Sequence, residues 1–207
     1  MLQRTDEWYQ SRLGRFTASD IYRLLGKETL KTTKQSIDTF AFEKAVETVF
    51  GKDEENIISF DMQRGIDLEP IAFERFKELK SYDFLDVKEV GFIKYKKHAG
   101  ASPDGLVSDN SNLEIKCPRR NKFFKIVANG VSEIDFKYIA QMQMQMLSLN
   151  SHKTHFFNFY IEKGIEYWHE LIINRDEEMI NLIDKRIEIA TEIKLDYIEK
   201  IKQNQQW

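Results

Sequence analysis

The chain has 207 residues, of which 42% are hydrophobic and 31% charged, and with only three prolines and nine glycines it is predicted to be a globular domain with a real core rather than a disordered chain. The net charge of −3 neither identifies nor excludes a nucleic-acid binder, and the single cysteine excludes an internal disulfide and a four-cysteine metal site. No apolar run is long enough to span a membrane and no signal peptide is recognisable, so we expect one cytoplasmic domain over residues 1–207.

The first 80 residues are predicted to be mainly helical. Threonine caps indicate helices over residues 5–13 and 17–25, and each of these is followed by a glycine. A third helix is expected over Lys34–Phe50, and a fourth over 61–80, in which Pro70 would kink or restart the helix. The expected apolar positions of the third helix are Phe40, Val46, Val49 and Phe50.

Residues 81–175 are predicted to form a sheet core. β-branched and aromatic residues favour a strand over 87–95, and GASPDGLVS and NLEIKCP favour two more strands joined by the turn SDNSN. FFKIVANG is expected to be a short helix, and THFFNFYIE and IEYWHELII a hairpin that turns at Lys163–Gly164. A long helix from 176 to about 202 follows. This order of elements predicts an α/β or α+β fold, with a mixed central sheet flanked by helices.

The segment QMQMQM, residues 141–146, alternates with a period of two, which is typical of a strand. The wider segment YIAQMQMQMLSL lacks β-branched residues after Ile139 and is rich in good helix formers. We therefore predict a helix over Phe136–Leu149, in which Gln141 and Gln145 share one face.

Three charged residues lie close together around the predicted SDNSN turn. Glu114 and Lys116 are two apart in one strand and therefore point to the same side, and the turn can bring Asp104 beside Glu114. Neighbouring carboxylates stay ionised when a cation lies between them, and oxygen ligands favour Mg²⁺ or Mn²⁺. Lys116 could then orient or deprotonate a water molecule, with its pKa lowered by burial and the cation. The alternative is a surface hairpin with an ordinary ion pair.

Several motifs, in order along the chain, resemble one nuclease family. SPDG…LEIKCP resembles the PD-(D/E)xK motif of restriction-endonuclease-like nucleases, and the whole chain is similar to the lambda exonuclease and YqaJ-like viral recombinase family. The other matching segments are EWYQSRLGRFTASDIYRLL, RGIDLEPIAFERF, YIAQMQMQML and the terminal NQQW. The resemblance implies a restriction-endonuclease-like core.

The resemblance also implies roles for individual residues. Asp104 and Glu114 would be the central metal ligands, together with the backbone carbonyl of Ile115. Glu69 would be a ligand of a second metal ion, with a helix-surface acid as the alternative, and Lys116 would position or activate the attacking water. The implied cofactor is Mg²⁺, with Mn²⁺ as an alternative and two ions in each site.

The family's 5′-phosphate pocket corresponds to Arg12, Ser19, Ser102 and Gln141 in this sequence. Each has an ordinary alternative; Arg12, for example, could offset the dipole at a helix C-terminus. A basic group after the motif lysine could contact the DNA backbone or be general surface charge, and it consists of Arg119, Arg120 and Lys122. Residues 30–60 carry no motif that aligns with the family, so strand-separating residues stay unassigned.

The function implied by the resemblance is that of a Mg²⁺-dependent exodeoxyribonuclease. It would load on double-stranded DNA ends, release 5′-mononucleotides from the 5′-ended strand and leave 3′ single-stranded tails. Relatives form ring-shaped trimers, so we expect a homotrimer, a phage or prophage origin and a single-strand annealing protein as partner. The alternatives are an endonuclease or single-strand nuclease with the same fold, and a non-catalytic DNA-binding or assembly protein.

Overall fold

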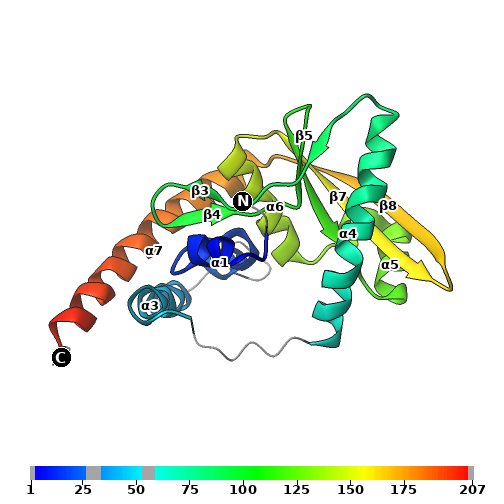
Figure 1. Cartoon of the computed structure of the whole chain (residues 1–207). Helices are drawn as coiled ribbons and strands as arrows, with labels where there is room; N and C mark the ends of the chain where they lie inside the picture. Colours follow the sequence, from blue (N-terminus) through cyan, green and yellow to red (C-terminus); the bar gives the residue numbers. More distant parts are fainter. Residues whose placement is uncertain (1–2, 27–33, 53–58, 205–207) are drawn as a thin grey trace.

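The structure is a computed structural model that describes residues 3–26, 34–52 and 59–204. Within these residues the strands form two sheets, a larger one in the order β2-β5-β6-β7-β8 and a smaller one in the order β1-β4-β3 (Figure 1). Strands β6 and β7 are parallel and the other neighbours in the larger sheet are antiparallel, so the predicted mixed sheet is confirmed. The strands are β1 (Phe16–Thr17), β2 (Val87–Lys88), β3 (Ile93–Tyr95), β4 (Ala99–Ala101), β5 (Gly105–Val107), β6 (Ser111–Lys116), β7 (Lys153–Glu162) and β8 (Ile165–Asn174).

Most of the predicted helices are confirmed, including the helix over QMQMQM. The α-helices are α1 (Asp6–Arg12), α2 (Tyr22–Leu25), α3 (Lys34–Phe50), α4 (Phe60–Ser81), α5 (Arg120–Asn129), α6 (Phe136–Leu149) and α7 (Glu177–Gln203). Helix α4 continues through Pro70 and does not restart there. Among the described residues, no helix combines the length and the apolar composition needed to cross a membrane. Residues 205–207 of the terminal NQQW lie outside the described residues.

Three predictions about the elements were wrong in detail. The segment 17–25 is not one helix, because Thr17 ends β1 and a 3-10 turn over Ala18–Asp20 precedes α2. The predicted strand over 87–95 divides into β2 and β3, and GASPDGLVS divides into β4 and β5. Each half pairs in a different sheet, β2 with β5 and β3 with β4. Pro103, which has no N–H to donate, lies where the chain crosses from the smaller to the larger sheet.

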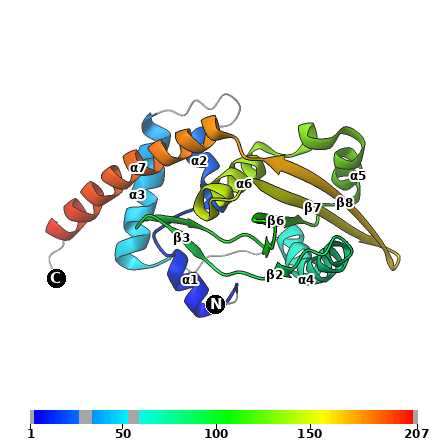
Figure 2. The same ribbon diagram turned by 90° about the horizontal axis from the view of Figure 1, so that it is seen from above.

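Of the apolar positions predicted for α3, only Phe40 is fully buried, and Val46 and Val49 are half-buried. Phe50 is 58% exposed, while the buried residues follow the helical spacing i, i+3, i+4 and i+8. This face packs against α7 and α2, where the small alanine side chains permit a close approach, and Figure 2 shows α3 crossing beneath α7. The buried residues of α3 are Ile37, Phe40, Ala41 and Ala45.

Strands β6 and β7 are covered on both faces. Helix α4 packs on one face, with Phe73 and Phe76 against Ile115 and Phe157, and helix α6 covers the other (Figure 2). Because both faces are covered, most residues of β6 and β7 are buried. The two helices therefore flank the C-terminal end of β6, the motif strand that carries Glu114 and Lys116, where the candidate residues lie.

Candidate active site

The crossing between the two sheets positions Asp104 beside the motif strand. The Asp104 backbone N–H donates to the carbonyl of Leu113 at 2.9 Å, and the backbone N–H of Ile115 donates to Asp104 Oδ2 at 2.6 Å. In the neighbouring strand, Glu114 and Lys116 point to the same side, and the Lys116 ammonium pairs with Glu114. The structure therefore brings Asp104, Glu114 and Lys116 together, as the sequence predicted.

Glu114 is held firmly, since its side chain is only 1% exposed. Its Oε1 accepts from Gln141 Nε2 at 2.7 Å as well as from Lys116, and its Oε2 accepts from Gln145 Nε2 at 2.5 Å. The predicted shared face of Gln141 and Gln145 is therefore the face of α6 that contacts the motif strand. Gln141, which was predicted to belong to the 5′-phosphate pocket, also lines a small hollow beside the carboxylates, but its amide donates to Glu114.

Sequence reasoning assigned no role to Gln145, although it placed the residue on the same helix face as Gln141. The Gln145 carbonyl accepts from Asn112 Nδ2 at 3.0 Å, and Asn112 Oδ1 in turn accepts from Ser151 at 2.9 Å and Thr154 at 3.1 Å. These polar side chains are all buried. A fully paired chain of this kind fixes the orientation of the carboxylate at its end. The i, i+4 spacing from Gln141 was the one signal in the sequence.

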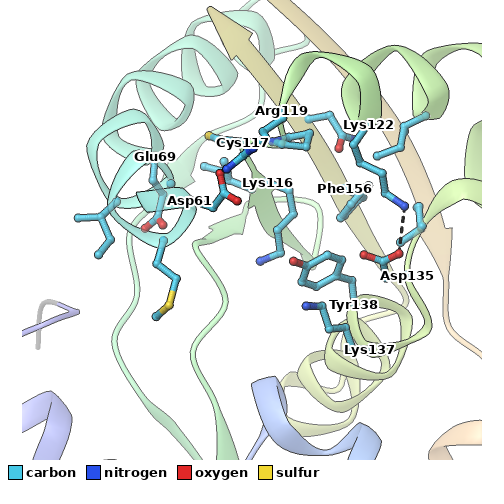
Figure 3. Close-up of a pocket in the computed structure, with 18 residues that line it drawn as sticks. Asp61, Glu69, Lys116, Cys117, Arg119, Lys122, Asp135, Lys137, Tyr138 and Phe156 are labelled. Carbon is cyan, nitrogen blue, oxygen red and sulfur yellow. Dashed lines mark hydrogen bonds and ion pairs between the residues drawn. The ribbon is translucent and has the colours of Figure 1, made fainter. Parts of the chain in front are cut away.

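Glu69 approaches the same cluster from α4, which lies beside β6 (Figure 3). Its Oε2 accepts from Arg4 Nη2 at 2.7 Å. Burial raises the pKa of Glu69, and Arg4 and Lys116 oppose this effect only in part. The proximity of Glu69 to the motif agrees with the prediction, but its pairing with Arg4 was not foreseen.

The three carboxylates are crowded. Burial raises the pKa of Asp104 well above its usual range, and the negative charges of Glu114 and Glu69 raise it further. The predicted lowering of the Lys116 pKa includes the charge of a nearby cation and stays a prediction. Burial alone would lower this pKa, but Glu114 and Asp104 outweigh burial and raise it. In this arrangement Lys116 is a protonated ammonium that compensates the carboxylates.

The carboxylates of Glu69, Asp104 and Glu114 are the candidate donor set for a divalent cation. Within residues 3–26, 34–52 and 59–204, no three acidic, histidine or cysteine side chains form a ready cage for an ion. The contacts explain this, since Lys116 engages Glu114 and Arg4 engages Glu69. The oxygen donors nevertheless suit a hard cation, and their crowding calls for positive charge. An ion would replace the charge that Lys116 and Arg4 now supply.

A small hollow of about 150 Å³ adjoins the carboxylates. Arg12 lies in it with its Nη1 donating to Ser102 Oγ at 3.2 Å and its Nη2 donating to Ser19 Oγ at 3.4 Å. The Arg12 guanidinium also lies over the Trp8 ring, 4.2 Å from the centroid, and Trp8 Nε1 donates to Ser102 Oγ at 2.9 Å. The structure thus gathers Arg12, Ser19 and Ser102 as predicted. Trp8, which the sequence offered only as part of a motif, supports two of them.

The predicted basic group is present but neutralised. Arg119 pairs with Asp61 at 2.6 Å, Arg120 with Glu162 at 3.1 Å and Lys122 with Asp135 at 3.0 Å. Arg119 and Lys122 lie on the wall of a larger hollow beyond Lys116, where Figure 3 shows the ion pair between Lys122 and Asp135. Contact between this group and DNA stays a prediction.

The fold and the cluster of carboxylates and lysine define the class of the protein as a nuclease with a restriction-endonuclease-like core. The family model of the YqaJ-like viral recombinase domain matches residues 7–152, and the chain belongs to that family.

Comparison with solved structures agrees. The alkaline exonuclease LHK-Exo from Laribacter hongkongensis is 30% identical, with a TM-score of 0.80 over 96% of this chain and 97% of that one. LHK-Exo in complex with dAMP is similar at 29% identity and a TM-score of 0.79, with the same coverage. A phage-related exonuclease from Haemophilus somnus 129PT is 16% identical, with a TM-score of 0.67 over 95% and 99% of the two chains, which is a likeness of fold alone. No curated protein sequence matches the chain.

Proposed function

We propose that the protein is a divalent-metal-dependent exonuclease that degrades the 5′-ended strand of double-stranded DNA and leaves 3′ single-stranded tails. The observation that carries the proposal is the small hollow beside the carboxylates. There Arg12 lies between two serine hydroxyls, and no acidic side chain among the described residues accepts a hydrogen bond from it. The planar guanidinium suits a terminal phosphate. The likeness to LHK-Exo, which was solved in complex with dAMP, supports exonuclease activity as the function of this chain.

In the proposed reaction each of these residues has a part. Arg12, Ser19 and Ser102 hold the 5′-terminal phosphate, so that the next phosphodiester falls beside Asp104 and Glu114. When bound there, a divalent metal ion would supply positive charge that offsets the negative charge developing on the phosphoryl oxygens. Mg²⁺ is the proposed ion, with Mn²⁺ as the alternative. Two ions would share the site, bound by Asp104, Glu114, the Ile115 carbonyl and, for the second ion, Glu69.

Lys116 orients the attacking water by donating a hydrogen bond to its oxygen. The water oxygen bonds to phosphorus and loses a proton, the bond from phosphorus to O3′ breaks, and O3′ takes up a proton in exchange for the one that the water lost. The released 5′-mononucleotide carries a 3′-hydroxyl, and the shortened strand begins with a new 5′-phosphate. Each cut therefore regenerates the group that the Arg12 pocket binds, which suits repeated cleavage from one end.

The proposal extends to assembly and partners. From the family we infer a ring-shaped homotrimer around the DNA and a single-strand annealing protein as partner. We also infer a phage or prophage gene whose product acts in the bacterial cytoplasm. A trimeric mass in light scattering is the expected result, and a monomeric mass at micromolar concentration would count against the ring.

A comparison of three DNA substrates tests the function. Linear duplex with 5′-phosphates should be degraded much faster than the same duplex with 5′-hydroxyls, and closed circular DNA should survive. Equal rates on all three would indicate an endonuclease and refute the proposal. Lys116→Ala should abolish turnover while DNA binding, measured by fluorescence anisotropy, stays largely intact. A fully active Lys116→Ala protein would contradict the role given to this lysine.

A further inference from the structure

A second, larger hollow of about 610 Å³ adjoins the small one, and Figure 3 shows the residues that line the larger hollow. The two hollows share Lys116 and Glu69, and Arg12 lines the small one alone. A DNA strand with its terminal phosphate on Arg12 and its first phosphodiester at the carboxylates must continue past Lys116. The larger hollow adjoins that point, because Lys116 lines both hollows.

The larger hollow has the lining that a nucleobase requires. The residues that line it include the aromatic Tyr138 and Phe156 and the apolar Met62 and Ile134. Of the two rings, Tyr138 is half-buried while Phe156 is only 1% exposed. The volume of the hollow falls within the ~300–1,000 Å³ of typical small-molecule and cofactor sites. Aromatic and apolar walls receive the faces of bases regardless of sequence, which suits an enzyme that removes nucleotides one after another.

Asn158 supplies a polar group in the same wall. It lies in β7 directly opposite Lys116 of β6, it lines the hollow, and its side chain is fully buried. Its Oδ1 has no hydrogen-bond partner among the described residues, which is unusual for a buried polar atom. Each DNA base carries an N–H donor on its Watson–Crick edge, which is the kind of group that this acceptor lacks.

The charges around the hollow also suit a DNA strand. Lys116 and Lys137 both lie near the Tyr138 ring, with their Nζ atoms 4.7 and 4.8 Å from its centroid. Figure 3 shows the two ammonium groups beside the ring. No acidic side chain within the described residues pairs with Lys137, in contrast to Arg119 and Lys122, which are neutralised. Lys137 is therefore available for the phosphate that follows the bound base.

We propose that the larger hollow binds the base of the second nucleotide, on the 3′ side of the bond that is cut, with Tyr138 and Asn158 as its principal contacts. This inference rests on the proposed exonuclease function and deepens it. The base in this hollow places the scissile phosphodiester, while the terminal phosphate in the small hollow marks the end of the strand.

Substrates that lack a single base test the inference. Three 5′-phosphorylated duplexes are compared, one intact, one abasic at nucleotide 1 and one abasic at nucleotide 2. All have the first three nucleotides unpaired, so that strand separation contributes equally. The rate of the first cleavage is measured with excess enzyme. Wild-type protein should cleave the substrate abasic at nucleotide 2 roughly tenfold more slowly than the intact one, given the usual strength of stacking between a base and an aromatic ring.

Variants of Tyr138 show whether this penalty arises in the hollow. Tyr138→Leu should reduce the penalty at nucleotide 2 to less than about threefold, and Tyr138→Phe, which keeps the ring, should retain it. Asn158→Leu should also reduce the penalty. If Tyr138 only positioned Lys116, Tyr138→Leu would slow the intact and abasic substrates equally, and the unchanged penalty would overturn the proposal.

Two further results would also overturn it, namely no penalty at nucleotide 2 in wild-type protein, or a penalty at nucleotide 1 that Tyr138→Leu removes. The same reactions include a 5′-hydroxyl duplex as a control for the proposed function. If the wild-type protein cleaved the 5′-hydroxyl and 5′-phosphorylated duplexes at equal rates, the proposed exonuclease function would be refuted. A preserved preference without a base penalty would refute only the assignment of the larger hollow.

Discussion

Replacing Gln145 by leucine tests whether this buried residue holds Glu114 in place. Gln145 is 0% exposed, and it donates to Glu114 at 2.5 Å and accepts from Asn112 at 3.0 Å. Leucine has a similar volume but can do neither, so a carboxylate oxygen and an amide nitrogen lose partners in the interior. Loss of a hydrogen bond to a charged group costs about 1.5–3 kcal/mol, and an unpaired amide adds about 1 kcal/mol. The free energy of unfolding, measured with urea, should fall by about 3 kcal/mol.

Gln143→Leu is the matched control, since Gln143 is 2% exposed on the same helix. Its bonds go to the Asn174 carbonyl and the Asp176 N–H, both at 2.9 Å, and not to the candidate site. It should lose about 2 kcal/mol of stability but retain wild-type Mn²⁺ binding. Mn²⁺ affinity, measured by calorimetry, should weaken about 10–100-fold in Gln145→Leu alone. Equal affinities in the two variants would refute the reasoning.

Two further predictions concern Arg12 and Lys194. Arg12→Ala should lower the preference for 5′-phosphorylated over 5′-hydroxyl duplex by at least about tenfold, because it removes a charge-assisted pair to the phosphate. An unchanged ratio of the two cleavage rates would show that Arg12 does not bind the 5′-phosphate. Burial, assisted by Arg15, lowers the pKa of Lys194 from 10.5 to about 8. Between pH 8 and 10.5 the unfolded chain therefore binds a proton at Lys194 that the folded chain has lost. The free energy of unfolding of the wild type, measured with urea, should rise with pH in that window relative to that of Lys194→Met. A pH-independent difference would contradict this.

The sequence predicted the elements whose structure depends on local residues. Helix propensity identified α6 despite the alternation of QMQMQM, and caps and glycines located α1 and the hairpin between β7 and β8. The division of residues 87–95 between two sheets could not be predicted in this way. The partners of β2 and β3 are different strands, so the break depends on pairing with residues further along the chain.

The candidate site shows the same limit. The spacing of two in β6 was enough to place Glu114 beside Lys116, and one turn placed Asp104 near them. The contact of Arg12 with Ser102 joins residues 90 positions apart, and only the family resemblance suggested it. No local pattern indicated that Arg4 would pair with Glu69. The i, i+4 spacing placed Gln145 on the same helix face as Gln141 but did not show that this face would contact Glu114.

The polarity of cleavage is the most direct test of the central claim. Linear duplex with 5′-phosphates is labelled either at the 5′ end or at the 3′ end of one strand and incubated with Mg²⁺ or with EDTA. With Mg²⁺, the 5′ label should appear at once as a mononucleotide, while the 3′-labelled strand shortens progressively, and EDTA should stop both reactions. Early release of the 3′ label, or cleavage that continues in EDTA, would contradict a metal-dependent exonuclease that acts from the 5′ end.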